Sequence, residues 1–68
     1  MIKYLVVLTF RQLSTNTTYV QVTGTLGHDI DHAGGKAERI IRETNKFSLN
    51  DYKLEARSVI EIDKLKYV

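Results

Sequence analysis

At 68 residues, 43% of them hydrophobic, the chain is long enough for one small domain over residues 1–68 and too short for two. Its net charge is +2, and basic and acidic residues are interspersed, so no concentrated basic run typical of nucleic-acid binding stands out. Because cysteine is absent, disulfides and thiolate zinc sites are excluded, and we expect a reducing, cytoplasmic location.

The first segment with strand character runs over residues 2–10. It is rich in β-branched and aromatic residues and apolar on both faces, which is typical of a central strand. This run is far shorter than the roughly 20 apolar residues that span a bilayer, so we expect no membrane contact. A polar, turn-prone stretch at 12–16 has the length of a hairpin connection.

The next segment, residues 17–26, alternates as a half-buried strand does. Its more apolar side carries Val20, Val22 and Leu26, and we expect that side to face the core. The other side, which begins with Tyr19, is then expected to be open to solvent.

Residues 29–46 predict one continuous amphipathic helix. At 100° per residue the apolar side chains fall within an arc of about 120°, and every charged residue lies outside it. The helix residues expected in the core are Ile30, Ala33, Ala37, Ile40 and Ile41.

After a turn, residues 52–63 alternate again and predict a third strand. The side of this strand expected to face the helix consists of Leu54, Ala56, Ser58, Ile60 and Ile62.

The predicted order is therefore β-β-α-β. The first strand is apolar on both faces, so it should lie in the middle of the sheet, between the other two. This gives an α+β domain, with a three-stranded antiparallel sheet of order 2-1-3 and one amphipathic helix packed on one face.

Two histidines, His28 and His32, stand four residues apart at the start of the predicted helix. That spacing allows two imidazoles to share a metal ion. The sequence offers no third ligand, and the helical phase directs both side chains to solvent. We expect no metal site and no cofactor here.

The sequence offers no catalytic arrangement. The run Gly34-Gly35-Lys36 resembles the end of a phosphate-binding loop, but Ala37 stands where such a loop needs Ser or Thr. A three-stranded sheet with one helix also leaves little cleft volume. We expect no catalytic residues and no enzyme activity.

The outer side of the predicted helix carries a basic stripe that could follow a phosphate backbone. Carboxylates border this stripe on both sides, which favours a solvated, salt-bridged surface over nucleic-acid binding. Nucleic-acid binding is therefore the alternative function, and its candidate residues are Lys36, Arg39, Arg42 and Lys46.

The sheet face that one helix leaves uncovered is the favoured candidate for binding a partner protein. A small apolar strip with a charged rim is typical of such surfaces. The residues predicted to form it are Leu5, Val7, Tyr19, Gln21, Arg57 and Val59. Because the strand at 17–26 carries no charge, a homodimer through its edge or through the open sheet face is also possible.

The size and element order of residues 2–63 resemble the small phage-encoded proteins that bind host machines, and are similar in layout to the bacteriophage T7 inhibitor of host RNA polymerase. The resemblance is one of pattern without a shared motif, so it assigns no role to any residue. It implies a non-enzymatic inhibitor or modulator of a host enzyme that acts by surface contact in the host cytoplasm. The mildly basic chain disfavours the acidic mimicry of DNA that some phage inhibitors use.

Overall fold

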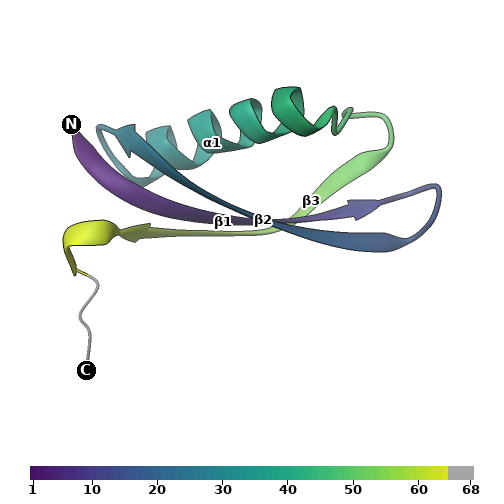
Figure 1. Cartoon of the computed structure of the whole chain (residues 1–68), viewed down its shortest axis with the longest axis horizontal. Helices are drawn as coiled ribbons and strands as arrows, with labels where there is room; N and C mark the ends of the chain where they lie inside the picture. Colours follow the sequence, from purple (N-terminus) through teal and green to yellow (C-terminus); the bar gives the residue numbers. More distant parts are fainter. Residues whose placement is uncertain (65–68) are drawn as a thin grey trace.

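The computed structural model describes residues 1–64 and has the predicted β-β-α-β order (Figure 1). Its elements are β1 (Ile2–Gln12), β2 (Thr17–Gly27), α1 (Ile30–Asn45), β3 (Tyr52–Glu61) and the short 3-10 helix η1 (Ile62–Lys64). The strands form one antiparallel sheet in the order β2-β1-β3, and α1 lies across one face of it. The predicted fold class and sheet order are confirmed.

The hairpin connection fixes the register between β1 and β2. Gln12 pairs with Thr17 across the four-residue connection 13–16, and the pairing continues without a shift to the far end of both strands. Asn16 closes the turn in the left-handed region at φ 58°, which asparagine tolerates better than most residues do.

Both ends of α1 are capped. The side chain of Asp29 accepts the backbone N–H of His32 at 2.8 Å, which satisfies one of the free amides of the first turn. At the other end Lys46 adopts a left-handed conformation at φ 57°, and its N–H bonds to the carbonyl of Arg42. These caps explain why the helix begins and ends within one residue of the predicted bounds.

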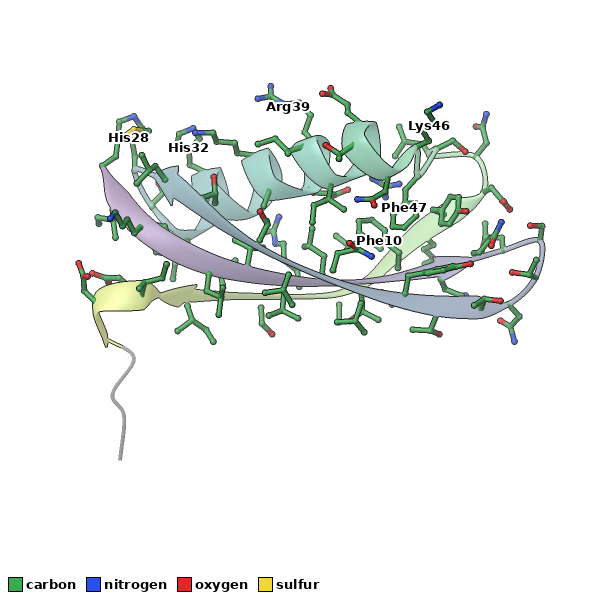
Figure 2. All side chains as sticks on the ribbon, viewed as in Figure 1. Phe10, His28, His32, Arg39, Lys46 and Phe47 are labelled. Carbon is green, nitrogen blue, oxygen red and sulfur yellow. The ribbon has the colours of Figure 1, made fainter. Side chains whose placement is uncertain are left out.

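The core lies between α1 and one face of the sheet, centred on β1. Val6, Leu8 and Phe10 are completely buried there. The other buried hydrophobic residues are Tyr4, Ala33, Ala37, Ile41 and Phe47. Figure 2 shows Phe10 and Phe47 between the helix and the sheet, where their rings meet edge to face with 5.2 Å between centroids.

Gly27 and small helix residues allow α1 to approach the sheet closely. A Cβ atom on Gly27 would lie 2.8 Å from the Cβ of Ala33, a distance that carbon atoms do not tolerate. The end of β2 and the first turns of α1 therefore pack in direct contact.

A β-bulge in β3 changes which side chains face the helix. Thr9 pairs with Ala56 and Phe10 with Leu54, so Glu55 is an extra residue on β3. A bulge shifts the in-out alternation by one position. As a result Leu54 and Val59 both pack against the core.

Two predicted strand faces are wrong. Residues directly opposite each other share a face, so Tyr19, opposite the buried Phe10, lies on the helix side, and the even-numbered residues of β2 lie on the other. On β3 the predicted core residues beyond the bulge also lie on the face that α1 does not cover. The residues that the register places on the uncovered face, contrary to prediction, are Val20, Val22, Leu26, Ala56, Ser58 and Ile60. Ile62, also predicted in the core, lies in η1 and outside the strand.

Two helix residues predicted in the core are exposed: Ile30 at 56% and Ile40 at 41%. Ile30 is the first residue of α1, so no preceding turn covers its side chain. The buried stripe is centred on Ala33, Ala37 and Ile41, which leaves Ile40 at its border.

Candidate protein-binding surface

The sheet face opposite α1 carries a continuous uncharged surface. No helix or strand of the described chain covers it (Figure 1), and side chains project from it (Figure 2). We call its centre the open face, defined by Leu5, Val7, Thr9, Val20, Val22, Gly24, Ala56, Ser58 and Ile60.

The open face is apolar and accessible. Val20 and Val22 are 60% and 58% exposed, and Ile60 is 39% exposed. With strands about 4.8 Å apart and same-face residues about 6.8 Å apart along a strand, its nine positions cover roughly 300 Å². Six of the nine positions are apolar, and exposed patches of a few hundred Å² that are largely apolar are often functional.

Among the described residues of β1 and β3, the charged side chains on this face stand at the two ends of the surface. Lys3 lies at one end, beside Leu5 along β1. At the other end Arg11 pairs across the strands with Lys53 and forms a salt bridge with Glu55. Three basic groups against one acidic group make this rim positive.

The structure separates the residues of the predicted binding strip. Leu5 and Val7 lie on the open face, as expected, and both are half-buried. The other members, Tyr19, Gln21, Arg57 and Val59, lie on the helix side of the sheet. The strip as predicted is therefore not one surface.

The hydrogen bonds and packing of Tyr19 show why it faces inward. Its ring lies 5.6 Å from that of Phe47 and 6.1 Å from that of Tyr52. Its hydroxyl donates to the side-chain carbonyl of Gln12 at 3.2 Å. The aromatic ring fills space beneath the end of α1 that a valine would leave empty.

Arg57 runs beneath α1 where the helix carries Gly34. A Cβ atom on Gly34 would lie 2.9 Å from Cζ and Nε of Arg57, so the glycine makes room for the guanidinium. The Arg57 Nη2 atom is 3.8 Å from a carboxylate oxygen of Asp31. This contact accounts for one glycine of the Gly34-Gly35 pair, while Gly35 has open space around it.

Arg42, predicted in the basic stripe, is held inside the protein. Its Nε bonds to Glu38 at 2.9 Å, and its Nη1 donates to the carbonyls of Phe47 at 3.2 Å and Tyr52 at 3.1 Å. Its guanidinium lies over the Phe10 ring, 4.9 Å from the centroid. These contacts join the end of α1 to the start of β3.

The other members of the basic stripe differ in their surroundings. Lys36 Nζ donates to the carbonyl of Leu26 at 3.3 Å, which ties it to β2. Arg39 and Lys46 are exposed on the outer side of α1 (Figure 2). Both line an open depression of about 700 Å³, but Glu38 and Glu43 line it too. This mixture of charges disfavours a phosphate ligand.

His28 and His32 stack on each other at the start of α1 (Figure 2). Their ring centroids are 5.0 Å apart at an interplanar angle of 15°. The His32 Nδ1 atom accepts the backbone N–H of His28 at 3.0 Å. Within residues 1–64, no three His, Cys, Asp or Glu side chains gather closely enough to hold a metal ion.

Asp51 forms a group of hydrogen bonds with residues 12–14 that no sequence pattern indicated, and we call this group the Asp51 clasp. Its carboxylate accepts the Gln12 side-chain amide and both the N–H and the hydroxyl of Ser14, each at 3.0 Å. Its own carbonyl accepts the N–H of Leu13. The bond from Gln12, followed by those from Ser14, holds the pKa of Asp51 below its usual value despite some desolvation. The clasp fixes the hairpin tip to the start of β3.

No helix within the described residues is long and apolar enough to cross a membrane. Neither protein-family models, nor curated proteins, nor solved structures match this chain. The functional proposal below therefore depends on the geometry of the open face.

Proposed function

We propose that this protein is a non-enzymatic module that binds another protein through the open face. The observation that supports this is the uncharged nine-residue surface, with Val20 and Val22 more than half exposed. Six of its nine positions are apolar and cover roughly 200 Å², and burying that area is worth roughly 5 kcal/mol at 25 cal/mol per Å². Association itself costs an estimated 4–15 kcal/mol, so tight binding also requires favourable contacts at the rim.

The charged rim defines the chemistry of the partner. Lys3, Arg11 and Lys53 at the ends of the open face favour a flat apolar surface bordered by acidic groups. The layout resemblance to phage inhibitors extends the proposal to a host enzyme as the partner, with the protein acting as its modulator in the host cytoplasm.

Substitutions at the centre of the open face test this proposal. Ser58 is exposed and pairs with Val7, so Ser58→Lys and Val7→Lys both place a charge in the middle of the surface. Arg39→Gln on the outer side of α1 is the control. We expect a protein captured by the wild type, once purified, to bind Arg39→Gln with unchanged affinity. Its affinity for Ser58→Lys should be at least about 10-fold weaker, because an apolar patch is then forced to bury a charge.

The proposal fails if the lysine variants remain folded by circular dichroism and bind as tightly as the wild type. Ser58→Lys keeps the experiment informative if the half-buried Val7 does not tolerate lysine.

Nucleic-acid binding, the alternative, is carried by the exposed Arg39 and Lys46, because Lys36 and Arg42 have partners within the chain. Two phosphate contacts give a slope of about −1.8 for log K against log salt on double-stranded DNA. A salt titration that gives a slope of about this size, reduced by about 0.9 in Arg39→Gln, would favour this alternative over the open face.

A further inference from the structure

The outer edge of β2 has free backbone groups. The backbone N–H of Leu13 donates to the carbonyl of Asp51 on the β3 side. Because backbone groups alternate in direction along a strand, the N–H and C=O groups of the even-numbered residues of β1 point towards β2. The residues of β2 that pair with them are odd-numbered. The backbone N–H and C=O groups of the even-numbered residues of β2 therefore point away from β1, towards solvent. Two hydrogen bonds from side chains confirm this direction for even-numbered residues. The carbonyl of Leu26 accepts the Lys36 ammonium, and the carbonyl of Gly24 accepts the hydroxyl of Thr23 at 3.4 Å.

The two edges of the sheet differ in charge. β2 has 11 residues, TTYVQVTGTLG, without a charged residue or a proline, and only Gly24 interrupts its middle. β3, the other edge, has the sequence YKLEARSVIE and carries two acidic and two basic side chains. Charged residues protect an edge strand from pairing, so β3 is protected and β2 is not.

β2 is uncharged on both faces beside this edge, and it is apolar on the open face. Val20 and Val22 are exposed on the open face. On the helix side β2 carries Tyr19, Gln21, Thr23 and Thr25, and Ile40 of α1 is 41% exposed. A strand added here would cover part of the exposed Val20 and Val22 side chains and would satisfy the backbone groups of the edge.

We infer that two copies of this chain join through antiparallel pairing of their β2 strands, forming one continuous six-stranded sheet with both helices on the same face. Lys36 already binds the carbonyl of Leu26, which favours a register centred on Gln21. That register places Val20 of each copy opposite Val22 of the other, and Thr18 opposite Gly24. No charged residue of β2 opposes another, because β2 has none.

A second copy fits this edge better than an unrelated peptide does. Each copy brings the same uncharged strand and the same exposed Ile40, so both partners bury apolar surface and satisfy free backbone groups. Val20 and Val22 also belong to the open face, but the pairing uses the backbone groups at the β2 edge, so this inference does not depend on the proposed function.

A proline substitution tests the pairing. The N–H of Val20 points away from β1, so Val20→Pro removes it without breaking the β1–β2 ladder, as edge strands tolerate. Val20→Thr keeps the N–H and the shape, and is the matched control. Sedimentation equilibrium should show a dimer for the wild type and Val20→Thr. Val20→Pro should raise the dimer dissociation constant at least about 30-fold, because each copy loses one interchain hydrogen bond.

Hydrogen exchange gives a second readout that needs no variant. The amides of Val20 and Val22 should become protected as protein concentration rises through the dimer range. A wild type that is monomeric up to millimolar concentration overturns the inference. A dimer that survives Val20→Pro, or that Ser58→Lys dissociates, overturns it in favour of pairing through the open face. Protection of these amides only by a different protein would show that β2 accepts an unrelated strand.

Discussion

Replacing Arg42 tests whether the basic stripe of α1 is a ligand surface or a structural contact. Arg42→Gln removes the charged donor from two backbone carbonyls, those of Phe47 and Tyr52. At about 1.5 kcal/mol for each charged hydrogen bond, this loss costs about 3 kcal/mol. The contact with the Phe10 ring adds roughly 0.5–1 kcal/mol, and the pair with Glu38 adds about 0.3–0.5 kcal/mol. Because glutamine can restore part of the bonding, we expect a net loss of about 3 kcal/mol.

Arg39→Gln is the matched control, because it removes the same charge from an exposed position on the same helix. Glutamine and arginine have similar helix propensities, so local effects cancel. Urea unfolding followed by circular dichroism should give a change within about 0.5 kcal/mol for Arg39→Gln. For Arg42→Gln the same measurement should show the loss of about 3 kcal/mol. In thermal unfolding this loss lowers the melting temperature by roughly 12–24 °C, because each kcal/mol corresponds to about 4–8 °C in a domain of this size. Equal stabilities of the two variants, measured at one protein concentration, would refute the structural role of Arg42.

Three further predictions concern the glycines and the Asp51 clasp. Gly35→Ala should raise the free energy of unfolding by about 1 kcal/mol, because a Cβ there meets open space, and chemical denaturation would measure it. Gly27→Ala should lower that free energy by about 1–3 kcal/mol, because its Cβ would overlap Ala33; a free energy that is unchanged or raised would contradict this packing. The pKa of Asp51 is depressed in the folded state, so its stabilising effect is complete above about pH 4 and is lost as the pH falls through the folded-state pKa. Asp51→Asn should remove this part of the acid sensitivity, and parallel stability profiles for the two proteins between pH 2 and pH 7, taken at roughly unit steps, would count against the clasp.

The elements, their order and the helix bounds could be predicted from the sequence because each depends on local patterns. The apolar first strand, the helical period and Asp29 at the start of α1 were sufficient for that. The side of β2 that faces the core was predicted wrongly, because the more apolar side of the strand was expected there and the pairing with β1 was not used. Pairing Gln12 with Thr17 across the short hairpin connection would have placed Tyr19 opposite Phe10, and therefore inside.

The face of β3 had no comparable local signal. The bulge at Glu55 reverses the alternation, and it depends on how β3 pairs with β1 across a long separation in sequence. The place of Arg57 beneath Gly34 follows from that bulge, and so does the exposure of Ile60. The residues of the open face therefore depend on how β3 pairs with β1, whereas the fold class does not.

Thiol footprinting tests most directly whether the open face is a free surface that a partner covers. The chain has no cysteine, so Ser58→Cys places one nearly isosteric probe on the open face, and Ser48→Cys places another on the exposed turn after α1. In the isolated protein both thiols should react with a maleimide at similar rates. With the captured partner bound, labelling should slow at least about 10-fold at position 58 and remain unchanged at position 48. Equal labelling at both positions with the partner bound, or slow labelling at position 58 in the isolated protein, would contradict the proposed surface.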